Sequence, residues 1–85
     1  MPPAQFLKDL LSPQEAEMLA KRIKIADQTV NITLMGNDPP VGWSKKDRLI
    51  YVEGAKLIAH ECAGISDFLD KKFAEAYKRA SEEIR

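Results

Sequence analysis

The sequence predicts a small α+β domain in which an N-terminal helix and a long C-terminal helix pack on a short β-hairpin. Three observations lead to this fold class. A capped amphipathic segment covers residues 13–27, a strand-like segment follows at residues 29–35, and a second amphipathic segment runs from residue 66 to the C-terminus. Helical periodicity on both sides of strand-like runs is typical of α+β domains. A mostly α fold is the alternative, because residues 44–62 also fit one long helix.

The first helix has a well-defined start. Ser12 can cap it, Pro13 suits the first helical position, and Glu15 completes a capping box. We therefore predict a helix over residues 13–27, with an apolar stripe that packs on the strand that follows. The stripe consists of Ala16, Leu19, Ala20, Ile23 and Ala26.

Residues 29–35, TVNITLM, have the pattern of a strand. Val30, Ile32 and Leu34 alternate with polar residues, and β-branched side chains are frequent, as in a half-buried strand. The turn residues of GNDPP then end the segment. This strand needs a partner, because a single strand leaves its backbone hydrogen bonds unpaired.

Residues 44–62 fit two structures, one long helix or a strand followed by a short helix. Ser44 and Asp47 resemble a capping box, which would start a helix that reaches Cys62. The strand would instead supply the partner that residues 29–35 need.

Two features argue against the long helix. It would place Ile50 and Leu57 opposite its main apolar face, and it would place Gly54 mid-helix at a cost of about 1 kcal/mol. The run LIYV, in contrast, is typical of a strand. We therefore favour a strand over residues 47–53, ended by Gly54, and a short helix from Ala55.

The C-terminal segment carries clear helix signals. Gly64 breaks the preceding helix and Ser66 caps the next one, which we predict to reach the C-terminus. Its apolar stripe consists of Leu69, Phe73, Ala76, Tyr77, Ala80 and Ile84.

The composition indicates one folded domain over residues 1–85, in which only the proline-rich residues 1–5 are expected to be frayed. The chain is 45% hydrophobic and 31% charged, as in folded rather than disordered proteins. A domain of this size has a thin core, so we expect association to be a means of stabilisation. Basic and acidic residues number 13 each, whereas nucleic-acid binders commonly carry a basic excess.

The sequence predicts a cytoplasmic protein without a membrane partner. It shows no signal-peptide pattern, and its longest apolar run, LIYV, is far too short to span a membrane. A single cysteine, Cys62, fits a reducing compartment.

We also predict that the protein is not an enzyme and holds no metal or cofactor. His60 and Cys62 are the only histidine and cysteine, and their spacing directs them to different sides of a helix. A metal site needs further ligands at compatible spacing. The glycines are scattered and form no phosphate-binding loop.

The segment around Trp43 is the candidate partner-binding site. Trp43 is the only tryptophan and follows Pro40 and Val41, and tryptophan is enriched at binding hot spots. Together with Tyr77 of the last helix, these residues form the predicted contact set. A Trp43 folded back on the core is the alternative.

A basic cluster beside Trp43 is the candidate for nucleic-acid contact. Such a cluster can hold phosphates while the aromatic ring stacks on a base. A solvated surface explains it equally well, since Asp47 interrupts it. The set consists of Lys45, Lys46 and Arg48, with Lys71 and Lys72 assisting.

Residues 10–27, LLSPQEAEMLAKRIKIAD, resemble the helix that enters the helix-turn-helix of the Trp-repressor family. The shared features are an apolar pair, Ser-Pro, an acidic residue and a basic–apolar alternation. The resemblance implies DNA binding by a second helix that follows after a short glycine turn. The chain continues instead with the strand-like residues 29–35.

Residues 64–80, GISDFLDKKFAEAYKRA, resemble the second helix of ribbon-helix-helix regulators and antitoxins. The resemblance implies a dimer that inserts a two-stranded ribbon into DNA. If residues 47–53 formed that ribbon, Arg48 would face the DNA.

Taken together, these patterns predict a small, non-enzymatic, intracellular binding module. It would act through a protein partner or as a homodimer in a regulatory role. The alternative is a DNA-binding transcriptional regulator or an antitoxin-like protein.

Overall fold

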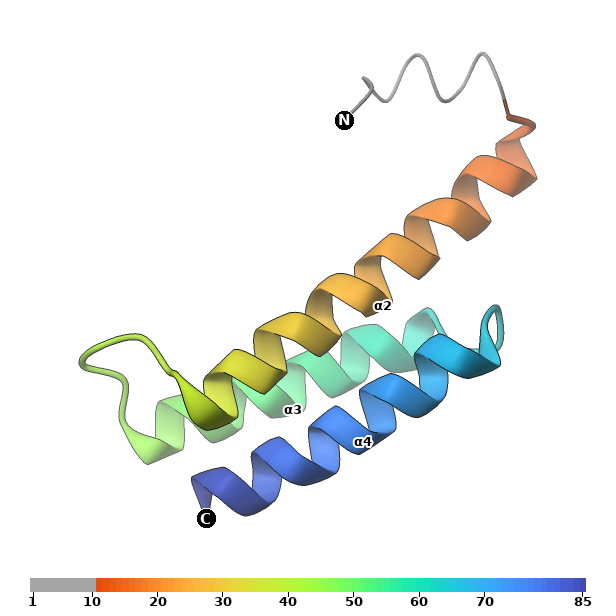
Figure 1. Ribbon diagram of the computed structural model, residues 1–85. Coiled ribbons are helices and arrows are strands. Elements are labelled where there is room, and N and C mark those ends of the chain that lie inside the picture. Colours follow the sequence, from red (N-terminus) through yellow and green to blue (C-terminus); the bar gives the residue numbers. More distant parts are fainter. Residues whose placement is uncertain (1–10) are drawn as a thin grey trace.

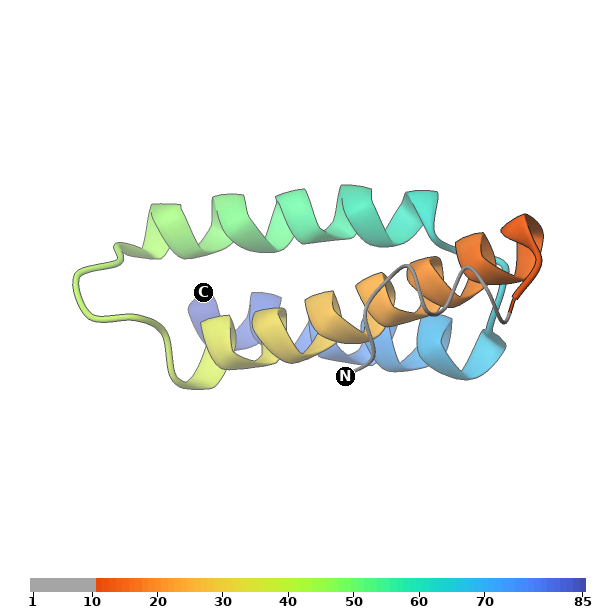
Figure 2. The ribbon, with the colours of Figure 1, turned by 90° about the horizontal axis from the view of Figure 1, so that it is seen from above.

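The computed structural model describes residues 11–85, which form three helices joined by two connections (Figure 1). The helices are α2 (Pro13–Asn37), α3 (Lys45–Glu61) and α4 (Asp67–Ile84). α3 runs antiparallel to the other two, and the N-terminal part of α2 diverges from the bundle (Figures 1 and 2). The prediction that residues 1–5 are frayed lies outside the described residues.

The predicted α+β fold class is wrong. Residues 11–85 contain no strand, and both predicted strands lie inside helices. Residues 29–35 form the last part of α2, which therefore runs well past the predicted end at residue 27, and residues 47–53 lie in the first half of α3. The mostly α alternative is confirmed for the described residues.

The strand-like residues of α2 are helical because their side chains suit a helix that packs on one side. Thr29 and Thr33 donate from Oγ1 to the carbonyl oxygens of the residues four positions earlier, at 2.7 and 2.8 Å, so each hydroxyl has a partner within the helix. Ile32 is fully buried, whereas Val30 and Leu34 are 58% and 47% exposed. The three apolar residues therefore do not share a face, as a strand would require.

The end of α2 lies very close to α4. A Cβ on Gly36 would stand 3.0 Å from the Cα of Ala80, so glycine permits an approach that a larger residue would block. The helix ends at Asn37, followed by the proline turn that was predicted to end this segment. Asp38 closes it by donating its backbone N–H to the carbonyl oxygen of Leu34 at 2.7 Å.

α4 starts at the predicted cap, whereas α3 starts at the capping box of the long-helix alternative, so the favoured short helix from Ala55 is wrong. Ser44 Oγ accepts from the N–H of Asp47 at 3.0 Å, and Asp47 Oδ2 accepts from the N–H of Ser44 at 3.2 Å, which completes a capping box. Ser66 Oγ accepts from the N–H of Leu69 at 3.2 Å. Gly64 makes the turn between the two helices with φ of +90°.

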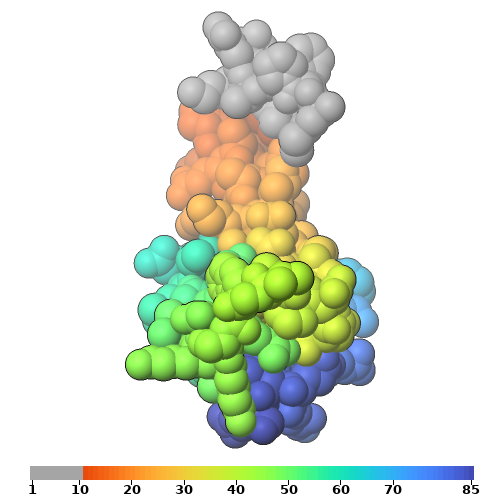
Figure 3. Space-filling model, turned by 90° about the vertical axis from the view of Figure 1, so that its left-hand side faces the viewer, coloured from red at the N-terminus to blue at the C-terminus, as the bar shows by residue number. Residues whose placement is uncertain are grey.

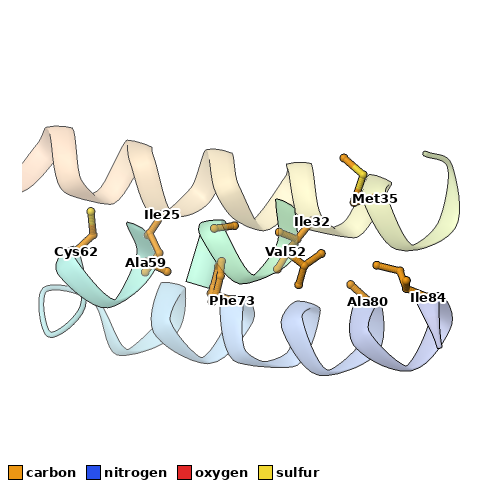
Figure 4. Close-up of a cluster of buried hydrophobic side chains, with 10 residues drawn as sticks. Ile25, Ile32, Met35, Val52, Ala59, Cys62, Phe73, Ala80 and Ile84 are labelled. Atoms are coloured by element: carbon orange, nitrogen blue, oxygen red, sulfur yellow. The ribbon is translucent and has the colours of Figure 1, made fainter. Parts of the chain in front are cut away.

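All three helices contribute to one thin core (Figure 4). Its centre is formed by Ile32 of α2 and Val52 of α3, both fully buried. The stripe predicted to be the inner face of the first helix is not that face, because Ile25, Ile32 and Met35 face the core instead. The buried hydrophobic residues are Ile25, Ile32, Met35, Val52, Ala55, Ala59, Cys62, Phe73, Ala80 and Ile84.

None of the three described helices is both long and apolar enough to cross a membrane.

Two glycine substitutions should change the free energy of unfolding in opposite directions. Gly36→Ala forces α2 and α4 apart, and we expect it to destabilise the protein by about 1–2 kcal/mol, because overpacking outweighs the gain in helix propensity. Gly54→Ala adds a methyl group in open space and should stabilise α3 by about 0.5–1 kcal/mol. Urea unfolding followed by circular dichroism measures both, and equal effects at the two positions would contradict this packing.

Candidate interaction surface

Arg48, a predicted nucleic-acid contact, binds the end of α2. Its Nε donates to the carbonyl oxygen of Met35 at 2.9 Å and its Nη2 to that of Gly36 at 3.0 Å. The last carbonyl groups of a helix lack intrahelical donors, and a cation there also suits the helix dipole. α2 has no basic residue in its own last turn, so Arg48 supplies that charge from α3.

The remaining predicted basic residues do not gather on one surface. Lys45 donates from Nζ to the carbonyl oxygen of Arg85 at 3.0 Å, which places it beside the C-terminal end of α4. Lys71 and Lys72 lie near the start of α4, about 20 Å away along its axis. Lys72 Nζ is 3.7 Å from a carboxylate oxygen of Glu75.

The predicted partner-binding residues divide between a free surface and an internal contact. Trp43 is 41% exposed and packs edge-on against Tyr51 of α3, with ring centroids 6.0 Å apart. One part of its side chain therefore contacts the helix, and the rest faces solvent. Pro40 and Val41 are exposed in the connection between α2 and α3, at the end of the molecule that faces the viewer in Figure 3. Tyr77 lies between α3 and α4, where it stacks on Phe73 and donates from its hydroxyl to Glu53.

The outer side of α3 carries an apolar row that continues from Trp43, and we call this row the α3 face. It consists of Trp43, Ile50, Gly54 and Leu57. Ile50 and Leu57 are 61% and 71% exposed, although both are large hydrophobic side chains. They border an open apolar groove with Lys46 and Leu49, and a second groove joins Ile50 to Trp43.

Ile50, Gly54 and Leu57 were missed as surface residues by the sequence reasoning. Their spacing of four and three residues places them on one helical face, and the capping box at Ser44 predicts the helix that carries them. The sequence argument rejected a long helix because it would point Ile50 and Leu57 away from the core. In the structure α3 is that helix, and the two outward side chains form the exposed apolar surface.

α2 also exposes hydrophobic side chains on the side away from the core. Ile23, Val30 and Leu34 are all more than 40% exposed and recur at helical spacing. Ile23 belongs to the stripe that was predicted to pack inward. Two outer helix faces of this small domain are therefore apolar.

The residues with catalytic or metal-binding chemistry are dispersed. Cys62 is buried in the core and His60 is exposed, as expected from their spacing on a helix. Among residues 11–85 there is no group of three or more histidine, cysteine or acidic residues able to hold a metal ion.

Comparisons with protein-family models, with curated proteins and with solved structures found no match for this chain.

Removal of the Arg48 guanidinium should loosen the end of α2. We expect Arg48→Met to lower the free energy of unfolding by about 2 kcal/mol, because two carbonyl groups lose a charged donor. Arg22→Met, at an exposed position of α2, is the matched control and should change it by less than about 0.5 kcal/mol. Equal stability of both variants in urea unfolding would show that the Arg48 contact does not hold α2 to α3.

Proposed function

We propose that this protein is a small helical binding module that docks a protein partner, or a second copy of itself, through the α3 face. The observation that carries the proposal is the exposed row of Trp43, Ile50 and Leu57. Contiguous exposed apolar surface on a small domain marks interaction sites, and tryptophan is a frequent anchor in them.

The charged residues around the α3 face support a protein partner more than a nucleic acid. Lys46 and Glu61 flank the helical part of the α3 face, before Ile50 and after Leu57, and give it a polar rim of both signs, as at protein interfaces. Phosphate contact would favour a surface of one sign. Arg48 and Lys45 are already engaged with backbone carbonyl groups of α2 and of Arg85.

The buried cysteine supports a cytoplasmic setting for this module. Cys62 is the only cysteine of the chain, and it lies in the core as a free thiol. A protein that relies on packing alone for stability suits a reducing compartment.

The proposal predicts that capture of a partner depends on the α3 face. Leu57→Lys and Trp43→Ala should each weaken binding to the captured partner by at least about 30-fold, because each removes an apolar anchor. Affinity capture from extracts of the source cell, followed by titration with the recovered partner, measures the loss. The emission of Trp43, the only tryptophan, reports directly on occupation of the surface.

Phe68→Lys is the matched control for this experiment. Phe68 is 66% exposed but lies at the start of α4, outside the α3 face. Phe68→Lys should leave capture of the partner unchanged. All three variants should keep the helical circular dichroism signal. Retained capture by both α3-face variants would refute the proposal, and unfolding of Trp43→Ala would identify Trp43 as part of the core.

A further inference from the structure

We infer that the occupant of the α3 face is the α3 face of a second copy, with the two helices antiparallel and crossing at Gly54. This inference rests on the proposed function and names the partner for the same surface. Three features of α3 support it: its central glycine, the symmetry of its apolar residues, and the charges at its two ends.

Gly54 lies in the middle of α3 and is exposed, with no described atom close to its missing side chain. A Cβ there would have nothing within 4 Å. Glycine inside a helix costs about 1 kcal/mol relative to alanine, and no contact within residues 11–85 compensates for it.

The other helical glycine shows what such a position can do. Gly36 lets α2 approach Ala80 of α4 so closely that a Cβ would be 3.0 Å from its Cα. Gly54 offers the same close approach on the outside of the bundle, between Ile50 and Leu57. A second helix that crosses here would fill the space that residues 11–85 leave open beside Gly54.

The apolar residues of α3 are arranged symmetrically about the centre of the helix. Ile50 and Leu57 lie at equal distances on either side of the midpoint between Glu53 and Gly54. In an antiparallel pair that crosses at this midpoint, Ile50 of each copy faces Leu57 of the other. A two-fold interface requires such self-complementarity.

The charges follow the same symmetry and select the antiparallel direction. Lys46, near the start of α3, and Glu61, its last residue, are also equidistant from the midpoint. Antiparallel packing brings Lys46 of each copy to Glu61 of the other, so the interface gains two opposite-charge pairs. Both side chains are exposed, and neither forms an ion pair with another residue between 11 and 85.

The dimer should be weak and depend on concentration. One helix face from each copy makes an interface at the small end of the range, below about 1,200 Å² in total. Trp43 extends the row beyond the start of α3 and adds to this area. We therefore expect a monomer–dimer equilibrium that shifts with concentration and with salt.

The first test is sedimentation equilibrium of the 85-residue chain, compared with Gly54→Ala. The wild-type chain should dimerise as concentration rises, and Gly54→Ala should weaken dimerisation by about tenfold or more because a methyl group separates the helices. The same variant should unfold at no lower temperature than the wild type when both are monomeric. Loss of association therefore could not be attributed to loss of folding.

The second test exchanges the charges at the two ends of α3. Lys46→Glu alone and Glu61→Lys alone should each weaken self-association by about tenfold at low salt, because each creates two like-charge pairs. Both substitutions suit the dipole of α3, so the helix itself should not be weakened. An equal mixture of the two single variants should recover wild-type association, since every pair then has opposite charges.

The outcomes separate this inference from the proposed function. A chain that stays monomeric, dimerises equally well with Gly54→Ala, or fails to recover on mixing the charge variants overturns the α3–α3 dimer. The proposed function still holds in those cases if capture of a different protein is lost on Leu57→Lys. If substitutions in the α3 face change neither self-association nor capture of a partner, both the dimer and the proposed function are refuted.

Discussion

The contact of the Arg48 guanidinium with the last carbonyl groups of α2 is the interaction on which the arrangement of the bundle depends. Met35 and Gly36 are buried, so their carbonyl oxygens at the helix end need donors from the protein. Arg48 provides them from the first turn of α3. Because Arg48 points toward α2, Val52 and Ala55, one and two turns further on, also face inward, and Ile50 and Leu57 must face outward. The α3 face is therefore a consequence of how α3 is attached to α2.

The two helical glycines illustrate how the same residue type can have different roles in one small protein. Gly36 is needed inside the bundle, where α2 and α4 approach most closely. Gly54 has no such neighbour in the described chain and lies within an exposed apolar row. A thin core leaves few residues to stabilise the fold, and exposed Ile50 and Leu57 represent apolar surface that residues 11–85 do not bury. Association would bury that surface without changing the fold.

The basic residues beside Trp43 show why residue type alone is a weak guide to function. In the sequence, Lys45 and Arg48 belong to a predicted phosphate-binding cluster. In the structure, both contact backbone carbonyl groups at helix ends. Such carbonyl groups and phosphates attract the same cations, because each presents partly or fully negative oxygen atoms. Only the position of each side chain relative to the other helices distinguishes the two roles. Trp43, in contrast, is 41% exposed and also packs against Tyr51, so it lies between the two positions that the sequence left open.

The sequence left the start of α3 at Ser44 as an alternative and placed the end of the first helix at residue 27, whereas α2 ends at Asn37. By itself it determined the starts of α2 and α4, which Ser12 and Ser66 cap, and the separation of the helices by the proline turn and Gly64. These signals are local, because a capping side chain bonds to backbone only three residues away. Tertiary structure alone decided that residues 29–35 and 47–53 are helical and which side of each helix is buried. Alternation in TVNITLM fits a strand as well as a helix, and packing of Ile32 against the other helices selects between them. The apolar outer faces could not be predicted for the same reason, since burial depends on contacts between residues that are distant in the chain.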